Sequence, residues 1–238
     1  GFALAYGVAD MSTLKIDPES GKQKPDYRWN DQPLTTQVYL NHLAGTQSIG
    51  VQPCNEESEA RFGVIDVDPK NYEDFDKKFF IDIIQNYKLP LIPVLSKSGG
   101  LHLYLFMKEF VPAVLIRSFL SNLLSLFKLK PDCEIFPKQT QLTKDNETGQ
   151  LNKGNFINLP YFKKSERLAI NLDGKPFTFD QFISVVESNT VHAEDLKNLT
   201  QSIEEKDLEG VDPEFEDGPP CLAHLSKIMR NPGFDGKD

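Results

Sequence analysis

The sequence contains few residues of the kinds that build disulfide frameworks or structural zinc sites. Its three cysteines, Cys54, Cys133 and Cys221, lie far apart in the 238-residue chain, and no Cys-x-x-Cys pair occurs. An odd number of widely spaced cysteines excludes a disulfide framework and a zinc knuckle. This cysteine usage is typical of a protein in a reducing, intracellular setting.

Long apolar runs are also missing. None approaches the roughly 18 residues that a membrane-spanning helix requires, so no membrane partner is expected. The start of the chain, GFALAYGVADMSTL, lacks the basic residues and the long apolar core of a signal peptide. Because the first residue is Gly rather than Met, we expect an excised fragment or the product of tag cleavage.

The net charge of −9 disfavours a nucleic-acid partner at first, but the negative charge is unevenly distributed. The segment Glu204–Asp217 holds eight carboxylates and one lysine, which accounts for seven of the nine excess negative charges. The rest of the chain is close to neutral and can carry local basic patches. The bland interpretation of the acidic segment is a solvated tether. The alternative is a segment that competes with nucleic acid for a basic groove, and its deletion would then tighten DNA binding.

Hydrophobic periodicity and turn residues predict alternating strands and helices after a turn-rich start. In residues 72–90, for example, Phe75, Phe79, Ile83 and Tyr87 recur every four positions, which indicates an amphipathic helix. The predicted helices are 33–45, 72–90, 111–129 and 178–188, and the predicted strands are 48–53, 61–69, 91–96, 101–107, 133–137 and 155–162. This order predicts an α+β fold in which helices pack on a mixed or largely antiparallel sheet.

The stretch FGVIDVDPKN, residues 62–71, places two carboxylates inside a strand that is otherwise apolar. Asp66 and Asp68 share one face of that strand, about 7 Å apart, while Ile65 and Val67 point to the opposite face. Two such carboxylates repel each other and lose hydration, so a positive partner must compensate them. Hard oxygen ligands suit Mg²⁺ or Mn²⁺, and two such ions can drive phosphoryl transfer. The alternative is that both aspartates are solvated at the end of a strand.

The second motif, SKSGGLHLYLF, is predicted to be a tight turn between two strands. Residues of the turn offer backbone N–H groups or polar side chains to a phosphate: Ser96, Lys97, Ser98, Gly99 and Gly100. His102 opens the next strand and, with Ser98, would hold a nucleoside triphosphate opposite the two aspartates. An ordinary glycine turn with a hydrogen-bonded histidine is the alternative.

The third motif is CEIFPKQ, followed later by GNFINLPYF. Glu134 stands in a short apolar strand, where it could complete a metal site with the two aspartates, and Lys138 could neutralise a phosphate. Asn155 and Asn158 could bond to sugar or phosphate groups. The alternatives are a half-exposed edge glutamate and asparagines that satisfy loop backbone.

Together, VIDVDP, SGGLHLY and CEIFPKQ…GNFINLPYF resemble the motifs of the archaeo-eukaryotic primase superfamily, in particular the primase-polymerases of phages, plasmids and bacterial mobile elements. The resemblance covers roughly residues 39–162. It implies a catalytic core with an RRM-like mixed or antiparallel sheet, preceded by an N-terminal α/β module. The first motif of the superfamily falls on Asp66 and Asp68, the second on Ser98 and His102, and the third on Glu134.

The resemblance implies a nucleotidyltransferase that copies a single-stranded or primed DNA template from NTPs or dNTPs with two Mg²⁺ or Mn²⁺ ions. It would act in the cytoplasm of a bacterial cell or a phage-infected host, with a helicase as a further partner in the same or another chain. The expected metal ligands are Asp66, Asp68 and Glu134, and these residues with His102 form the expected catalytic set. The expected nucleotide-binding residues are Ser96, Lys97, Ser98, Gly99, Gly100, His102, Lys138 and Asn158.

The same resemblance sets the expected domain boundaries. Residues 1–200 would form the catalytic domain, with an N-terminal module over about 1–60, a catalytic sheet over about 61–165 and a closing helix over about 176–200. Residues 201–217 would form an acidic linker, and 218–238 the start of a helical module. The chain has no spacing for the zinc-binding insertion of some primases, which leaves open whether it starts primers or only extends them.

Three rival interpretations share parts of this pattern. A metal-dependent nuclease would use the same carboxylates without a triphosphate pocket. An end-joining repair polymerase would prefer gapped ends with a 5′-phosphate, and an RRM-like single-strand binder would need no metal. Template bases could stack on Tyr104 and Phe106, which are equally good core residues, and Arg28 and Trp29 could touch template or nucleotide.

Overall fold

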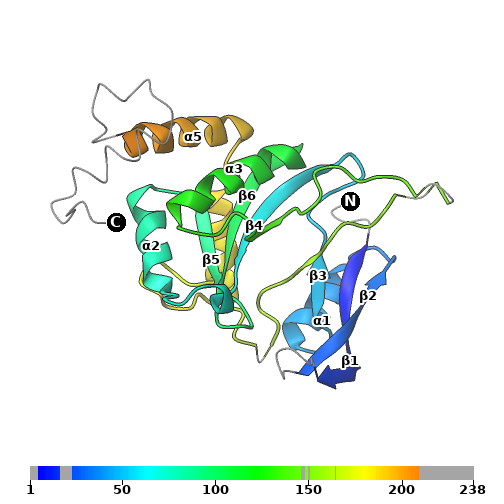
Figure 1. Cartoon of the computed structure of the whole chain (residues 1–238). Helices are drawn as coiled ribbons and strands as arrows, with labels where there is room; N and C mark the ends of the chain where they lie inside the picture. Colours follow the sequence, from blue (N-terminus) through cyan, green and yellow to red (C-terminus); the bar gives the residue numbers. More distant parts are fainter. Residues whose placement is uncertain (1–4, 17–22, 146–147, 150, 164, 209–238) are drawn as a thin grey trace. The chain divides into compact units, whose positions relative to one another are not determined.

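The computed structural model describes residues 5–16, 23–145, 148–149, 151–163 and 165–208 (Figure 1). The chain forms two compact units, Gly1–Ala193 and Glu194–Asp238, and the elements below belong to the first unless stated otherwise. None of the helices in the described ranges is long and apolar enough to span a membrane.

Four antiparallel strands form the central sheet, which carries both aspartates of the DxD motif at one end. Strand β4 (Glu59–Val67) lies between β6 (Leu101–Pro112) and β7 (Glu134–Phe136), and β5 (Leu91–Leu95) pairs with the other edge of β6. All three pairings are antiparallel, and β5 and β6 form the expected hairpin. The predicted α+β class with a largely antiparallel sheet is therefore confirmed.

Helix α3 (Ala113–Leu126) covers the face of β4 that holds Ile65 and Val67, both of which are fully buried. On that face a Cβ atom on Gly63 would lie 2.3 Å from the side chain of Ile116. The strand and the helix therefore approach each other as closely as glycine allows.

Helix α2 (Lys77–Asn86) begins after the N-cap residue Asp76, and it packs through Phe80 against Phe127, with ring centroids 5.6 Å apart. Its buried residues are Phe80, Ile81 and Ile84, so the expected stripe of Phe75, Phe79, Ile83 and Tyr87 is wrong. The helix starts too late to include Phe75, and its buried side lies one position along from that stripe.

The opposite face of the central sheet is apolar over most of its length. Val64, Tyr104 and Phe136 lie side by side on three strands and belong to a core that also includes Phe182 of helix α4 (Phe179–Asn189). Tyr104 is 2% exposed and stacks on Phe106, with ring centroids 5.6 Å apart. Tyr104 is a core residue, so the idea that a template base stacks on it is wrong, whereas Phe106 is only partly buried against that core and its contact with template stays a prediction.

A second, N-terminal sheet is formed by β1 (Tyr6–Ile16), β2 (Gln23–Asn30), β3 (Ile49–Val51) and β8 (Ile157–Asn158), in the order β2-β1-β3-β8. Helix α1 (Thr36–Ala44) ends at Gly45, whose φ of 79° is the left-handed conformation that glycine favours. Two features differ from expectation: the start of the chain is a β-hairpin, and β8 joins this sheet although it was expected in the central one.

One closing helix was expected over 176–200, but the structure has two, α4 and α5 (Ala193–Leu208). All of α5 after Ala193 belongs to the second unit. The break arises because Val191 pairs with Met107 of β6, and its carbonyl accepts from the Lys108 amide. The carboxylate of Glu109 then accepts from the Ala193 amide at 2.9 Å. The first part of the expected linker is thus helical, and the expected segments 209–217 and 218–238 lie outside the described residues.

His42 provides a pH-dependent test of how the N-terminal sheet is held. Its ring is 2% exposed; Nδ1 accepts from the Ile49 amide at 3.2 Å, and Nε2 donates to the Pro160 carbonyl at 2.8 Å. Burial lowers the pKa of His42 below its ordinary value of 6.5. Below pH 6.5 the His42 side chain is therefore protonated more readily in the unfolded chain than in the folded one. The free energy of unfolding should fall as the pH drops below 6.5.

Urea unfolding of the wild type and His42→Gln at about pH 7.5 and about pH 5 measures this contribution. The variant should lose less stability on acidification than the wild type. His192→Gln, which changes an exposed histidine, is the control. Equal acid sensitivity of the wild type and His42→Gln would show that His42 is not the group that titrates.

Candidate active site

Residues of three neighbouring strands form a transverse row across the central sheet, centred on Asp66. In the antiparallel register Asp66 of β4 lies directly opposite His102 of β6 on one side and Glu134 of β7 on the other. Directly opposite residues share one face, with Cβ atoms about 5 Å apart. The structure therefore brings together three of the residues that the sequence assigned to one site.

The row lies where the buried core gives way to solvent. The Asp66 side chain is 28% exposed, His102 is 12% exposed, and the His102 Nε2 atom lies 3.3 Å from Asp66 Oδ1. On the same face, the preceding row of Val64, Tyr104 and Phe136 is buried. A charged group bound at the row is thus partly shielded from water on one side, which strengthens its interaction with the carboxylates.

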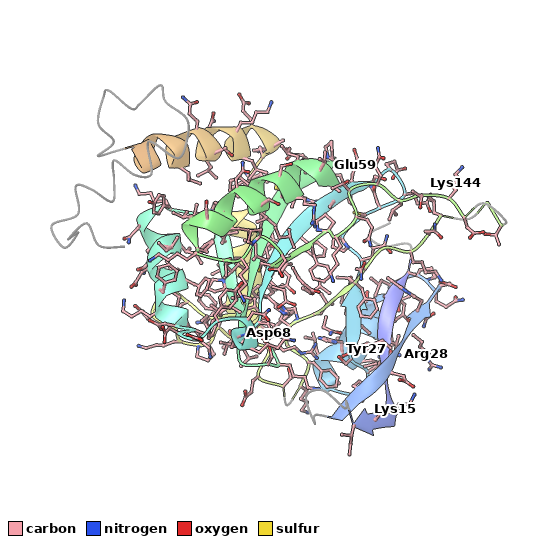
Figure 2. The ribbon with its side chains drawn as sticks, viewed as in Figure 1. Lys15, Tyr27, Arg28, Glu59, Asp68 and Lys144 are labelled. Carbon is pink, nitrogen blue, oxygen red and sulfur yellow. The ribbon has the colours of Figure 1, made fainter. Side chains whose placement is uncertain are left out.

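Asp68 lies just beyond the end of β4 and starts a short 3₁₀ helix, η1 (Pro69–Asn71) (Figure 2). Its carboxylate accepts from the Lys70 amide at 3.2 Å and lies 3.0 Å from Lys70 Nζ. The hydrogen bond to Asp68 and the charge of that carboxylate raise the pKa of Lys70. Lys70 was not among the residues predicted from the sequence, although its place two residues after the DxD motif was a visible signal.

Glu134 is paired with Lys138, whose Nζ lies 2.8 Å from Glu134 Oε1. Within the described ranges, no three His, Cys, Asp or Glu side chains converge in positions that could hold a metal ion. Each acidic side chain of the site instead has a cationic or protonatable partner: Lys138 for Glu134, Lys70 for Asp68 and His102 for Asp66. Because the Glu134 side chain is 55% exposed, rotation toward Asp66 needs no rearrangement of the core.

The chemistry of the donor set fits a hard divalent cation. Three carboxylates from β4, its end and β7 supply the oxygen ligands that Mg²⁺ and Mn²⁺ prefer. The nearby thiol of Cys133 donates to the Asp66 carbonyl at 3.4 Å, and burial raises its pKa to about 11. Because this thiol is directed at the backbone, the donor set that the row offers consists of carboxylate oxygens.

The turn between β5 and β6 is held by its own hydrogen bonds. The Gly99 amide donates to the Ser96 carbonyl at 3.1 Å, and the Gly100 amide donates to Ser96 Oγ at 3.1 Å. The two glycine amides therefore already donate inside the turn, Gly99 at an exposed position and Gly100 at a buried one, and their binding of a phosphate stays a prediction. Ser96 is 4% exposed and supports the turn, while Lys97 and Ser98 are exposed beside the row.

Asn158 lies on β8 of the N-terminal sheet, and its backbone carbonyl accepts from the hydroxyl of Tyr104 at 3.5 Å. Its side-chain Oδ1 atom is buried and has no hydrogen-bond partner among the described residues. The structure thus places Asn158 beside the core residue that follows His102 on the same face of β6. The side-chain oxygen of Asn155 accepts a hydrogen bond of 2.6 Å from the Gln139 side chain.

Residues 15–206 match the family described as the archaeo-eukaryotic primase domain of the TOTE conflict system. The chain belongs to this family. The match covers most of the chain and confirms the resemblance that the three motifs indicated. An archaeo-eukaryotic primase domain implies a nucleotidyltransferase of the primase and polymerase type, with nucleotides and nucleic acid as its substrates.

Two further comparisons add little to the family assignment. No curated protein matches the chain. Among solved structures, the archaeo-eukaryotic primase domain of the cyanophage S-2L primase-polymerase is 11% identical, with 78% of this chain and 90% of that chain covered. The TM-score of that comparison is 0.37, which is too low to support an argument about the site.

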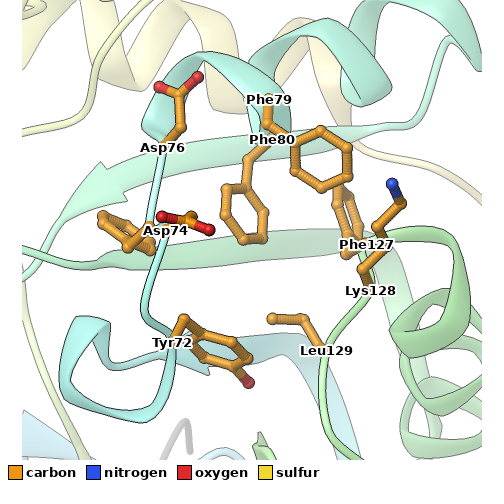
Figure 3. Close-up of a pocket in the computed structure, with 9 residues that line it drawn as sticks. Tyr72, Asp74, Asp76, Phe79, Phe80, Phe127, Lys128 and Leu129 are labelled. Atoms are coloured by element: carbon orange, nitrogen blue, oxygen red, sulfur yellow. The ribbon is translucent and has the colours of Figure 1, made fainter.

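An aromatic pocket elsewhere in the primase domain holds none of the expected site residues. It lies between the segment before α2 and the end of α3 (Figure 3). Its lining residues are Tyr72, Asp74, Phe75, Asp76, Phe79, Phe80, Phe127, Lys128 and Leu129. Lys128 Nζ lies 5.5 Å from the centroid of the Phe79 ring, so a cation–π interaction stabilises the ammonium group of Lys128 in this pocket.

Proposed function

We propose that this primase domain transfers nucleotides from NTPs or dNTPs to a primer end or a first nucleotide, as directed by a DNA template. One observation carries the proposal: Glu134, Asp66 and His102 lie in register across three strands, with Asp68 at the end of the middle strand. Carboxylates placed at the end of one strand and directly opposite it on the next have a clear use in divalent-cation chemistry and none in packing.

Asp66, Asp68 and Glu134 would hold two Mg²⁺ or Mn²⁺ ions. When bound, the ions would lower the pKa of the attacking hydroxyl and stabilise the leaving pyrophosphate. His102, next to Asp66, would hold a phosphate oxygen, and the exposed Lys97 and Ser98 would contact the β- and γ-phosphates. Lys138, once released from Glu134, would be free to pair with the same phosphates.

Two biological roles are candidates for this nucleotidyl transfer. The motifs favour a role in copying the DNA of a phage, plasmid or mobile element, with a helicase as a partner. The matching family is named for a conflict system, so a role in conflict between a host and such an element is the second candidate. Both settings require the same nucleotidyl transfer, and the experiment below does not depend on the choice.

Metal binding can be tested apart from synthesis. Adding Mn²⁺ at about 100 times its dissociation constant should stabilise the wild type by about 2.7 kcal/mol, because only the folded chain assembles the carboxylates. Glu134→Gln removes one carboxylate and should reduce the Mn²⁺-dependent rise in melting temperature. Thermal unfolding with and without Mn²⁺, and with a nucleotide added, measures both effects.

Glu187→Gln, which changes an exposed glutamate of α4, is the matched control and should respond to Mn²⁺ like the wild type. Stabilisation by Mn²⁺ that survives in Glu134→Gln at full size would remove Glu134 from the metal site. Stabilisation by Mn²⁺ without any effect of nucleotide would favour a nuclease over a polymerase.

A further inference from the structure

One face of the N-terminal sheet carries aromatic side chains over a floor of glycine. In the register of the sheet, Trp29, Gly7, Gly50 and Asn158 form one transverse row across all four strands. Tyr27 lies two residues before Trp29 and therefore points to the same face. We call this surface, with Tyr27, Trp29 and Phe156, the aromatic face.

The ring of Phe156 lies flat against the two glycines. A Cβ atom on Gly7 would lie 2.5 Å from that ring, and one on Gly50 would lie 2.3 Å from it. The Phe156 ring centroid is 5.6 Å from that of Tyr27 and 5.1 Å from that of Trp29. Two positions without side chains thus hold a cluster of three rings on the sheet surface, and Tyr27 remains 45% exposed.

The opposite face of the same sheet is an ordinary hydrophobic core. Tyr6, Val8 and Ile49 are buried there and pack against Val38 of α1. Stability of the sheet is therefore supplied from the α1 side. The exposed ring of Tyr27 is not needed for that core, which leaves it available for a ligand.

Arg167 adds a buried positive charge beside the aromatic face. It is 8% exposed; its Nη2 donates to Ser48 Oγ at 3.0 Å, and its guanidinium lies over the Phe162 ring. Arg167 forms no ion pair with a carboxylate among the residues that the structure describes. Burial lowers its pKa, and Tyr27 and Tyr104 are its electrostatic neighbours.

The guanidinium is also incompletely hydrogen-bonded. Arg167 Nε and Asn158 Oδ1 are the two fully buried side-chain atoms without a hydrogen-bond partner in the described part of the chain. The described residues also form no hydrogen bond with Arg167 Nη1, and 8% of the residue surface remains exposed. Burying a cation whose N–H donors lack acceptors costs free energy unless a bound anion accepts their hydrogen bonds. A guanidinium can donate two parallel hydrogen bonds to a phosphate.

We infer that the aromatic face and Arg167 together bind single-stranded nucleic acid, with a base on Tyr27 and a backbone phosphate on Arg167. The inference rests on the proposed function, for which it names the residues that hold the template. Stacking surfaces combined with a buried cation are the means by which proteins hold single strands without reading their sequence. Arg167 also interacts electrostatically with Tyr104, two residues along β6 from His102, so a strand bound at Arg167 would pass near the catalytic row.

The test measures binding of a fluorescent oligothymidylate of about 12 nucleotides by anisotropy, without metal or nucleotide, so that catalysis plays no part. Tyr27→Ala should weaken binding about tenfold, because one stacking contact is lost. Tyr39→Ala removes a tyrosine of similar exposure, 38%, from α1 on the other side of the sheet, and it should bind like the wild type. Equal affinities for Tyr27→Ala and the wild type would overturn the inference.

Arg167 is tested by the salt dependence of the same binding. Arg167→Gln should lower the slope of log affinity against log salt by about 0.7, the change for one phosphate contact on a single strand. Lys78→Gln, which removes an exposed cation from the surface of α2, should leave the slope unchanged. Because Arg167 is buried, melting temperatures must show that its variant is folded, and Arg167→Lys supplies a second variant that keeps the charge.

Two further arms separate the possible failures. If Arg167→Lys binds the oligonucleotide normally but loses stabilisation by nucleoside triphosphate, the phosphate belongs to the nucleotide and the inference is wrong. Asp66→Asn should still bind the oligonucleotide while losing synthesis. If Asp66→Asn keeps synthesis, the proposed function fails, whereas the binding result for Tyr27 is judged on its own measurement.

Discussion

Asp66→Asn is expected to reduce nucleotide incorporation by about a thousandfold, because it removes the negative charge at the centre of the row while keeping the shape of the side chain. Asp66 lies directly opposite both His102 and Glu134 in the register of the sheet, so its carboxylate is the central one of the row. The measurement is incorporation of labelled nucleotides on a primed template with Mg²⁺ or Mn²⁺. Asp68→Asn should show a loss of the same order.

The matched control is Asp82→Asn. Asp82 is an exposed aspartate of α2 that pairs with Lys78 on the helix surface, and its variant should retain wild-type synthesis. Melting temperatures of all three variants show whether a loss of synthesis reflects unfolding. Undiminished synthesis by Asp66→Asn would refute both the metal assignment and the proposed mechanism.

Gly100→Ala is expected to damage both the fold and the activity. A Cβ atom at this position would lie 2.0 Å from the Val67 carbonyl oxygen and 2.7 Å from the ring of Pro69. A backbone carbonyl cannot move aside as the end of a flexible side chain can, so the turn must separate from the end of β4. We expect this separation to lower the free energy of unfolding by about 3 kcal/mol. His102 follows two residues later, and its displacement from Asp66 should reduce synthesis at least tenfold, by roughly the 1.4 kcal/mol that one misplaced contact costs.

Gly99→Ala is the matched comparison in the same turn. Gly99 has a φ of 88°, but no atom lies within 4 Å of the position that a Cβ atom would occupy. Its variant should lose about 1 kcal/mol through backbone strain alone and keep most of its activity. Urea unfolding and primer extension on both variants measure the difference. If Gly100→Ala is no more harmful than Gly99→Ala, close approach of the turn to β4 is not what positions His102.

Features that depend only on residues close together in the chain could be predicted from the sequence. The alternation around Ile65 and Val67 revealed a buried strand, and charges within it stood out because they are costly there. The glycine pair at 99 and 100 marked a turn between two strands, and the structure has it at the expected place. Spacing within one strand or one turn is set by the covalent chain, so the sequence reports it directly.

Features that depend on distant partners were not predictable in this way. Strand β8 has two residues, and its pairing with Gly50 rather than with the central sheet follows from contacts more than a hundred residues apart. Tyr104 looked as suitable for stacking on a template as for packing, and only the neighbouring strands and α4 show that it is buried. Arg167 stands alone in a polar stretch, and nothing near it in the chain signals a buried charge.

By itself the sequence showed that Asp66 and Asp68 stand at the end of an otherwise apolar strand, and it predicted metal-dependent chemistry from that placement; Glu134, expected to be equally costly, is in fact 55% exposed at the sheet edge. The tertiary structure decided that Asp66 lies directly opposite His102 on one side and Glu134 on the other, because register between strands is a property of the whole sheet. It also decided that the glycine amides of the turn are already engaged and that the Arg167 guanidinium is buried with no carboxylate partner among the described residues. Burial and hydrogen bonding depend on every neighbour in space, and the chain fixes those neighbours only when it folds.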